Sequence, residues 1–326
     1  MIVWPFGRLI VLRSGLRHLL SIQVILHVYE MPLDFGASRH GSDMGPSAIR
    51  LAGLRERLSA LGHVIERDEC PIPTEPQESL DPGNPKAKYL PQIKAACSAL
   101  AARVEESAGS GAFPLVLGGD HSVALGTLAG MGEWARKAGK TLGVLYVDAH
   151  GDFNTPETSP TGNIHGQCLA ASCGYGLPQL VGLHAPGRKV DPRNVCFAGT
   201  RDLDPGEREL MRNAGVSVFS MSEIDRTGFP EIVRRITGFF RDRGVDAVHV
   251  SFDMDVLDPM FAPGTGIPLP AGLTNREALL MMEEIASTGL VRSAEIVEVN
   301  PVLDVRNQTA VLAVALAARL LGEKTW

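Results

Sequence analysis

The stretch YVDAHGDFNTP, residues 146–156, places Asp148, His150 and Asp152 at alternate positions directly after an apolar run. In an extended segment, side chains at alternate positions lie on one face, with successive Cα atoms of that face about 6–7 Å apart. Carboxylates and imidazoles are common metal ligands, but one small ion cannot comfortably bind every ligand in such a row. Two ions about 3.5–4 Å apart, bridged by carboxylates and a water, can do so. The stretch therefore predicts a two-metal site.

Two other segments carry residues of the same types. The segments GGDHS and SFDMDVLDP contribute His121, Asp253 and Asp255, each after its own apolar run. Because the carboxyl ends of parallel strands meet at one edge of a sheet, we expect these side chains to converge with the first three. Any one of them alone would more simply cap a turn or a helix, as Asp120 or Ser122 would after the first run. The three strand ends together favour a metal site.

The predicted ligand set contains four carboxylates and two imidazoles: His121, Asp148, His150, Asp152, Asp253 and Asp255. This set suits Mn²⁺ better than it suits a structural zinc site, which prefers cysteine and closes at four ligands. Zinc, iron and cobalt also bind ligands of these types. Burying four carboxylates together without cations would be prohibitively costly. We therefore expect two bound cations.

Short apolar runs rich in Val, Ile and Leu alternate with longer helical patterns along the chain. The predicted strands are 22–28, 62–68, 113–119, 142–148, 194–199, 216–220, 247–253 and 293–299. The predicted helices are 46–61, 88–108, 122–139, 206–214, 229–243, 274–288 and 307–321. This alternation predicts one α/β domain of three layers, α/β/α, with a mostly parallel sheet of about eight strands covered on both faces.

Composition narrows the class of protein. The 326 residues are 44% hydrophobic and 21% charged, which is typical of a globular protein with a large core. The net charge of −6 argues against a nucleic-acid partner. The five cysteines are scattered and lack C-x-x-C spacing, which argues against a disulfide framework and favours a reducing compartment. We expect a cytoplasmic protein without a membrane partner.

The first twenty residues differ from the rest of the chain. They are basic and apolar, with Arg8, Arg13 and Arg17 and no acidic residue. They lack the charge order and the cleavage site of a secretory signal, and they are too charged to span a bilayer. A disordered extension, a weak targeting peptide and an upstream start codon all fit this composition. We expect a non-core extension over 1–20 and a single domain over 21–326.

Four motifs together resemble one family. GGDHS, DAHGDFNTPETSPTGNIHG, SFDMDVLDP and VEVNP occur in the order and at the separations of the ureohydrolase (arginase/agmatinase) family, most like its bacterial arginase-type members. The resemblance extends from about residue 34 to the C-terminal helix. It implies a binuclear manganese hydrolase that splits a guanidino compound into urea and an amine. It also implies that Asp148 and Asp253 bridge the ions, one of which would bind His121 and Asp152 and the other His150 and Asp255.

The resemblance also implies roles in the reaction. Two cations lower the pKa of a bridging water, so that hydroxide is available near neutral pH. Asp152 would accept a hydrogen bond from that hydroxide and orient it. His165 would pass a proton to the departing amine, and Glu298 would hold the guanidinium by charge-assisted hydrogen bonds. In simpler interpretations, His165 packs a loop and Glu298 is a surface charge at a strand end.

The choice of guanidino compound depends on a few residues. By resemblance, Asn154 and Thr161 would bind an α-carboxylate, while Asp204, and Glu207 slightly farther away, would face an α-ammonium. These residues favour L-arginine, which would give L-ornithine and urea. Ile267 stands where the family commonly has threonine, which would weaken substrate orientation or indicate another guanidino acid such as 4-guanidinobutyrate. Agmatine and formimidoylglutamate are the other alternative substrates within the family.

Two other functions fit these residues less well. A metal-binding scaffold without catalysis would not need His165 and Glu298. A two-metal phosphoesterase would carry basic phosphate-binding residues, whereas the residues expected around the metals are acidic. The family assembles as homotrimers or homohexamers. Arg276 and Glu277 would form an interface ion pair or, equally, cap and solvate the start of a helix.

Overall fold

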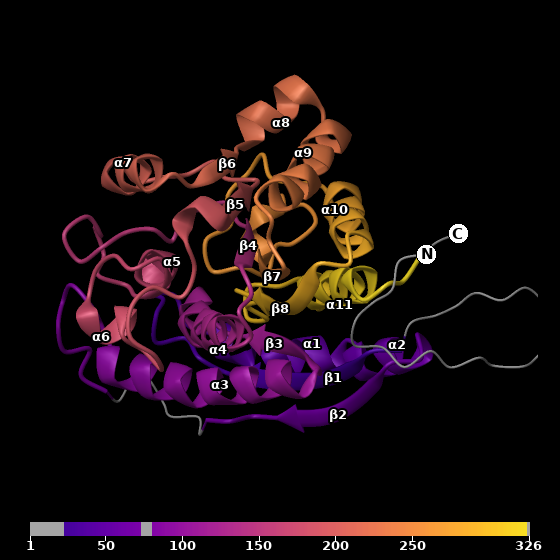
Figure 1. Cartoon of the computed structure of the whole chain (residues 1–326), viewed down its shortest axis with the longest axis horizontal. Helices are drawn as coiled ribbons and strands as arrows, with labels where there is room; N and C mark the ends of the chain where they lie inside the picture. Colours follow the sequence, from indigo (N-terminus) through magenta and orange to yellow (C-terminus); the bar gives the residue numbers. More distant parts are fainter. Residues whose placement is uncertain (1–22, 73–79, 325–326) are drawn as a thin grey trace, which may run out of the picture.

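The computed structural model describes residues 23–72 and 80–324, and the predicted extension 1–20 lies outside them. Within the described ranges, eight strands form one sheet in the order β2-β1-β3-β8-β7-β4-β5-β6 (Figure 1). The strands are β1 (Ile25–Met31), β2 (Val64–Glu69), β3 (Phe113–Gly118), β4 (Leu142–Val147), β5 (Val195–Ala198), β6 (Ser217–Phe219), β7 (Ala247–Asp253) and β8 (Val291–Val297). Every neighbouring pair of these strands is parallel, so the predicted mostly parallel sheet is parallel throughout.

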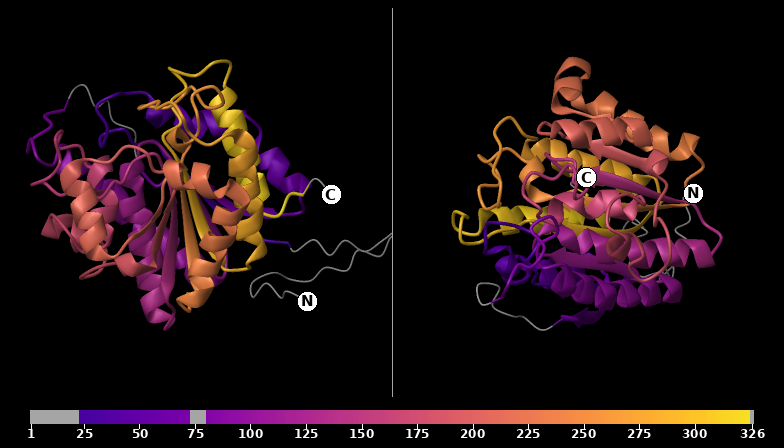
Figure 2. Two further views of the ribbon diagram at one scale, coloured as in Figure 1. Left: turned by 90° about the horizontal axis from the view of Figure 1, so that it is seen from above. Right: turned by 90° about the vertical axis from the view of Figure 1, so that its left-hand side faces the viewer.

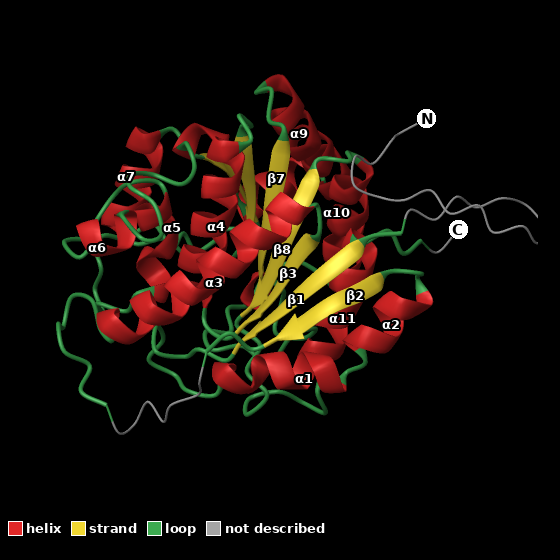
Figure 3. Cartoon of the chain, turned by 60° about the horizontal axis from the view of Figure 1, so that its bottom comes forward, coloured by secondary structure: helices red, strands yellow, loops and turns green. Residues whose placement is uncertain are grey.

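Helices cover both faces of the sheet and complete the predicted three layers (Figures 2 and 3). One face carries α3 (Leu90–Ser110), α4 (Ala124–Lys137), α5 (Cys168–Ser172), α6 (Pro178–Val181) and α7 (Pro205–Ala214). The other face carries α1 (Gly45–Leu51), α2 (Leu54–Ala60), α8 (Met221–Thr227), α9 (Phe229–Asp242), α10 (Asn275–Ser287) and α11 (Gln308–Leu320). Each layer of helices closes its own hydrophobic core against the sheet.

Alternate residues of the central strands enter opposite cores. On β7, Val248, Val250 and Phe252 enter the core beneath α9, α10 and α11. The alternation of side chains along a strand therefore places the fully buried His249 and Ser251 on the opposite face, which α4 covers. Polar side chains inside this core need hydrogen-bond partners there. The hydrogen bonds of Ser251 extend to the candidate site described below.

Some element boundaries differ from the predictions. The single helix predicted over 46–61 is two helices, because Gly53 between α1 and α2 adopts a left-handed conformation with φ of 91°. The strand predicted over 22–28 is shifted, since β1 ends at Met31. The helices α5, α6 and α8, with 5, 4 and 7 residues, were not predicted because such short segments carry too little periodicity.

The first turn of α10 tests one of two readings of Glu277. The side chain of Thr274 accepts a hydrogen bond from the backbone of Glu277, and the Glu277 carboxylate accepts one from the Thr274 backbone N–H at 2.8 Å. This reciprocal pair is a capping box, which satisfies two backbone donors at the helix start. Glu277 therefore caps a helix, and an interface role for Arg276 stays a prediction.

The middle of the sheet brings four strand ends together. β3, β8, β7 and β4 are consecutive neighbours, and because they are parallel their carboxyl ends lie at one edge. Directly after β3, the backbone of Gly119 lies very close to that of Leu33. A Cβ atom on Gly119 would lie 1.9 Å from the Leu33 carbonyl oxygen. The absence of that atom lets the next backbone N–H, of Asp120, donate to the same oxygen at 2.6 Å. The segments that follow these strands therefore meet at one place.

Candidate active site

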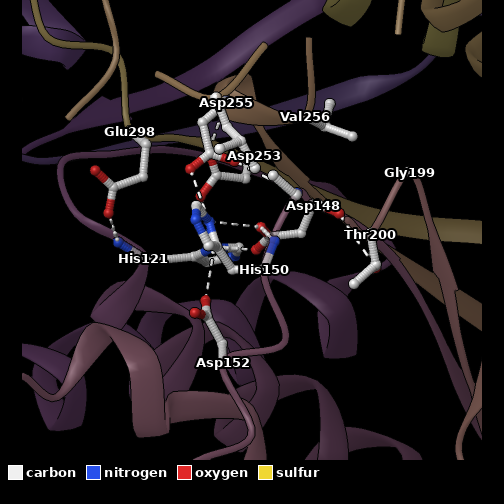
Figure 4. A network of polar contacts seen from close by, with 12 residues as sticks. His121, Asp148, His150, Asp152, Gly199, Thr200, Asp253, Asp255, Val256 and Glu298 are labelled. Carbon is white, nitrogen blue, oxygen red and sulfur yellow. Dashed lines mark hydrogen bonds and ion pairs between the residues drawn. The ribbon is translucent and has the colours of Figure 1, made fainter. Parts of the chain in front are cut away.

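The six predicted ligands converge at this edge of the sheet (Figure 4). The first lies in a short 3₁₀ helix after β3, three lie in the segment after β4, and two lie at the end of β7 and just after it. They are His121, Asp148, His150, Asp152, Asp253 and Asp255. Three separate segments, the last of them more than 100 residues after the other two, thus supply one cluster, which confirms the predicted convergence of three strand ends.

His121 is the centre of the first group of ligand atoms. Its Nδ1 lies 3.1 Å from Asp148 Oδ2, 3.0 Å from Asp152 Oδ2 and 3.1 Å from Asp253 Oδ2. All four side chains are buried. Three of them, His121, Asp148 and Asp253, are spaced closely enough to hold one metal ion. A metal ion at this position would neutralise the carboxylates, which otherwise have only the His121 imidazole beside them.

His150 is the centre of a second group beside the first. Its Nδ1 lies 3.0 Å from Asp255 Oδ2 and 3.6 Å from Asp148 Oδ1. His150, Asp148 and Asp255 form a second set with metal-ligand spacing, and Asp148 belongs to both sets. A shared carboxylate is the arrangement that a bridged pair of ions requires. The wider ligand sets predicted above, in which Asp253 also bridges, stay a prediction.

Hydrogen bonds beneath the cluster determine the tautomer of His121. Its Nε2 lies 2.7 Å from Ser251 Oγ, and that hydroxyl donates to Glu295 Oε1 at 2.7 Å. Because Ser251 gives its only proton to Glu295, it must accept one from His121 Nε2. A neutral imidazole then has an unprotonated Nδ1, whose lone pair points at the three carboxylates. Such a lone pair is a metal ligand oriented from behind, so the residues present fit a bound cation.

The electrostatics of the carboxylates lead to the same conclusion. Burial raises the pKa of Asp148, and the charges of Asp152 and Asp255 raise it further. Burial also raises the pKa of Asp253, with Asp255 and Asp148 adding to the effect. Asp148 Oδ2 has no hydrogen-bond donor within the described part of the chain. Carboxylates packed in this way keep their charge at neutral pH only beside cations, and two metal ions would supply them.

Two residues of the cluster have unusual backbone conformations. Asp152 has a φ of 47° and Glu298 a φ of 63°, in the left-handed region that residues with a Cβ rarely adopt. Each costs on the order of 1–2 kcal/mol relative to an ordinary conformation. Both residues lie where the chain has just left a central strand, and both side chains line the cavity described below. Part of the backbone strain of the described chain therefore lies at the candidate site.

His165 and Glu298 form a pair next to the cluster. His165 Nδ1 lies 3.2 Å from Glu298 Oε1, and the same oxygen accepts a hydrogen bond from the backbone N–H of His121 at 2.9 Å. Burial lowers the pKa of His165, but the hydrogen bond to Glu298 and the nearby carboxylates outweigh it and raise the pKa to about 9. The contact with Glu298 therefore favours the protonated form of His165, which is able to donate a proton. Glu298 is no surface charge, because it is 5% exposed.

The raised pKa of His165 predicts a pH-dependent contribution to stability. Because the folded-state pKa is about 9 and the unfolded value about 6.5, the contribution is complete below pH 6.5 and is lost as the pH rises towards 9. We expect the difference in free energy of unfolding between the chelator-treated wild type and His165→Asn to shrink by about 1–3 kcal/mol between pH 6 and pH 9.5. Urea unfolding at both pH values measures it, and a constant difference would contradict it.

The cluster opens into a cavity of about 600 Å³. Asn154 Nδ2 donates to Asp204 Oδ2 at 2.9 Å, and Thr158 donates to Asn154 Oδ1 at 2.9 Å. The Thr161 hydroxyl oxygen accepts from the Asn163 backbone at 3.2 Å, which leaves its proton free to donate. The structure thus gathers all four predicted substrate-binding residues on the cavity wall beside the ligands: Asn154, Thr161, Asp204 and Glu207.

Glu207 also has a structural part that the sequence did not reveal. It is 3% exposed, and its carboxylate accepts the backbone N–H of Phe153 at 2.8 Å and that of Asp204 at 3.2 Å. Burial raises the pKa of Glu207 to about 8. The contact with Asp204 completes a capping box at the start of α7. Glu207 therefore ties the segment after β4 to α7, which sets the position of Asp204 on the wall.

Ile267 lies on another part of the same wall. The side chain is 47% exposed and presents only hydrocarbon to the cavity. Its loop is fastened by Arg39, which donates to the Gly266 carbonyl oxygen at 3.0 Å. Gly266 in turn packs next to Glu298, since a Cβ atom there would lie 3.4 Å from Glu298 Oε2. The predicted loss of a hydroxyl thus falls beside the residue expected to hold the guanidinium.

Comparison with known proteins decides the family. A family model described as the arginase family matches residues 25–322. An arginase from Bacillus caldovelox is 46% identical over 300 residues, which cover 92% of this chain and 98% of that protein. An arginase from Bacillus subtilis (strain 168) is 45% identical over 299 residues, which cover 92% of this chain and 98% of that protein. The chain belongs to the arginase family.

A solved structure of the arginase family has the same fold. The crystal structure of arginase from Bacillus cereus is 47% identical to this chain and superposes with a TM-score of 0.87. The superposition covers 93% of this chain and all of that one, at 100%. The resemblance seen in the four motifs is therefore confirmed over almost the whole domain.

Several residues that support this arginase-family site were not predicted. Arg201 follows β5 and donates to the backbone oxygens of Asp255 at 2.9 Å, Val256 at 3.0 Å and Leu269 at 2.7 Å. It thereby fixes the loop that carries Asp255. Its only signal in the sequence was a basic residue in the acidic stretch RDLDPGE. For Ser251, the only signal in the sequence was the presence of polar residues at alternate positions of β7 and β8.

Across the described ranges, no helix combines the length and the apolar character needed to cross a bilayer.

Proposed function

We propose that this arginase-family protein hydrolyses L-arginine to L-ornithine and urea at a two-manganese centre. The observation that carries the proposal is the pair of metal-ligand groups sharing Asp148 beside a largely acidic cavity. An acidic cavity suits a cationic guanidinium and repels a phosphate ester. Relatives that are 45% and 46% identical over 92% of the chain are named arginase, which supports the same substrate.

The proposed reaction assigns a task to each side chain of the cluster. Bound cations would supply a hydroxide near neutral pH from a water that is otherwise a poor nucleophile. Asp152 would accept a hydrogen bond from that nucleophile and direct it at the guanidinium carbon. Glu298 would hold the guanidinium by charge-assisted hydrogen bonds. As the bond between that carbon and the side-chain nitrogen breaks, the protonated His165 would donate its proton to the departing amine.

The far end of L-arginine would meet the opposite charges it requires. Thr161 has a free hydroxyl proton for the α-carboxylate, and the Asn154 amide lies beside it on the cavity wall. Asp204 would bind the α-ammonium, and Glu207 would keep Asp204 in place. Agmatine lacks the α-carboxylate, so it would forgo the hydrogen bonds that Asn154 and Thr161 would make to that group. The loss of these hydrogen bonds favours arginine.

We also propose the metal, the assembly and the location of the protein. Two Mn²⁺ ions per subunit agree with a ligand set of carboxylates and imidazoles without thiolates. A homotrimer or homohexamer and a cytoplasmic location follow from the resemblance and the cysteine usage described above. The five cysteines are free in the structure, as a reducing compartment requires.

Steady-state urea release from a panel of guanidino compounds tests the proposal. After loading with Mn²⁺, we expect kcat/KM for L-arginine to exceed that for agmatine and 4-guanidinobutyrate by about 10²-fold or more, because each lacks one charged group that the wall would pair. Formimidoylglutamate, assayed by product release, should be a poor substrate. Ile267 favours a rival substrate, a different guanidino acid, because isoleucine lacks the hydroxyl that threonine would add to the cavity that Glu298 also lines. Faster turnover of 4-guanidinobutyrate than of L-arginine would decide for that rival.

A further inference from the structure

Tyr146 is a buried side chain in contact with the candidate metal centre. It is the second-last residue of β4 and is completely buried, on the face of the sheet that α3, α4 and α5 cover. Its ring stacks on the His121 imidazole with centroids 4.6 Å apart and an angle of 3° between the planes. Phe197 of the neighbouring strand β5 also packs against Tyr146, at 5.0 Å between ring centroids. The ring is therefore held firmly and has little freedom to move.

The hydroxyl of Tyr146 reaches a different ligand from the one its ring covers. It donates to Asp152 Oδ2 at 2.7 Å, and Cys168 Sγ lies 3.5 Å from the hydroxyl oxygen. Asp152 Oδ2 is also the oxygen 3.0 Å from His121 Nδ1. No group in the described ranges donates to Asp152 Oδ1. One side chain thus touches two of the six ligands, and it distinguishes between the two oxygens of Asp152.

The conformation of Asp152 explains why such a contact is needed. With a φ of 47°, the Asp152 backbone has a strained conformation. More relaxed backbone conformations would compete with it. A carboxylate also rotates about its terminal torsion, over which the energy is broad and roughly two-fold. The Tyr146 hydroxyl and the backbone contacts of Asp152 O with Leu169 N and Ala170 N restrain both freedoms. Of these, only the hydroxyl acts on the carboxylate itself.

We propose that Tyr146 is a positioning residue for the reaction. Its hydroxyl holds Asp152 Oδ2 towards the first group of metal ligands and leaves Oδ1 for the attacking nucleophile, while its ring holds the plane of the His121 imidazole. This inference rests on the proposed two-metal function and deepens it. Tyr146 does not line the cavity, so its effect on substrate passes through Asp152 and His121.

Tyr146→Phe tests the proposal, because it keeps the stacked ring and removes only the hydroxyl. We expect kcat for L-arginine to fall about 10–100-fold with KM changed less than about two-fold, and the Kd for the Mn²⁺ bound by the first group of ligands to rise about 10-fold. Titration of the chelator-treated, full-length protein with Mn²⁺ measures the Kd without any substrate. If L-arginine is not turned over by the wild type, the proposed function fails, whereas the comparison of Mn²⁺ affinities still tests Tyr146.

Tyr29→Phe is a matched control. Tyr29 lies in β1, is completely buried, and its hydroxyl lies 2.7 Å from Ser107 Oγ, away from the ligands. We expect this variant to lose stability as Tyr146→Phe does, with Mn²⁺ affinity and kcat at wild-type values. Equal effects of both variants on Mn²⁺ affinity, or no effect of either, would overturn the proposal.

A second background tests whether Tyr146 acts through Asp152. In Asp152→Ala protein, the side-chain oxygen to which Tyr146 donates is already lost. We therefore expect Tyr146→Phe to change the Mn²⁺ Kd less than about two-fold in that background, against about 10-fold in the wild type. A full effect in both backgrounds would show that the hydroxyl does not act through Asp152 and would overturn the positioning role.

Discussion

Asp152→Asn should leave the fold intact and lower kcat for L-arginine by about 10³-fold or more. Asparagine has nearly the same shape, so the Tyr146 hydroxyl still finds a carbonyl oxygen to donate to. The amide replaces one acceptor oxygen with a donor and removes a full negative charge beside the proposed cations. It can therefore neither accept a hydrogen bond from the nucleophile as a carboxylate does nor ligate as strongly.

The manganese content of the variant separates the possible causes of that loss. The manganese content of the purified variant, by elemental analysis, shows whether the second ion is still bound. Two ions with a 10³-fold lower kcat would identify orientation of the nucleophile as the main role. Asp191→Asn is the control, since Asp191 caps a short helix at the amino end of β5 and should not affect kcat. Near-normal turnover by Asp152→Asn would contradict the role proposed for it.

Asp253→Asn should have a comparable effect for a different reason. Asp253 ends β7, lies 3.1 Å from His121 Nδ1, and is predicted to bridge both ions. Without its charge, the attraction between the cluster and two divalent ions falls, and we expect fewer than two Mn²⁺ per subunit. Because metal ions supply several kcal/mol of charge stabilisation, kcat should fall by about 10³-fold or more.

The same motif offers a matched control for Asp253. Asp258 accepts hydrogen bonds from the backbone of Met260 at 3.0 Å and of Ala271 at 2.9 Å, and it lies outside both metal-ligand groups. Asp258→Asn should loosen the loop and retain two Mn²⁺ per subunit by elemental analysis. If Asp253→Asn also retained two tightly bound ions, its bridging role would be wrong.

The ligands were predictable because strand ends carry information that a single sequence displays. An apolar run shows where a strand ends, and parallel strands deliver their ends to one edge, so residues 121, 148–152 and 253–255 had to meet. The layer beneath them was not predictable in this way. Ser251 reaches Glu295 because these two residues are paired in register between β7 and β8. Strand order and register are properties of the assembled sheet.

The roles of individual residues show the same limit. Glu207 was expected near the substrate from its motif, and the structure shows in addition that its carboxylate binds two backbone N–H groups. Tyr146 was only one residue of a buried strand, because nothing in the sequence tells which side chain its hydroxyl will reach. The break at Gly53 was also missed, since the helical pattern continues on both sides of it.

The strand order has a consequence for how the protein is made. β8, the last strand in the sequence, lies between β3 and β7 in the sheet. Until residues 291–297 have left the ribosome and inserted there, β3 with His121 and β7 with Asp253 have no strand to join them. Such late, long-range pairing is slow compared with local folding. The metal-ligand cluster is therefore assembled last, and a chain truncated before β8 would hold its ligands on two separate half-sheets.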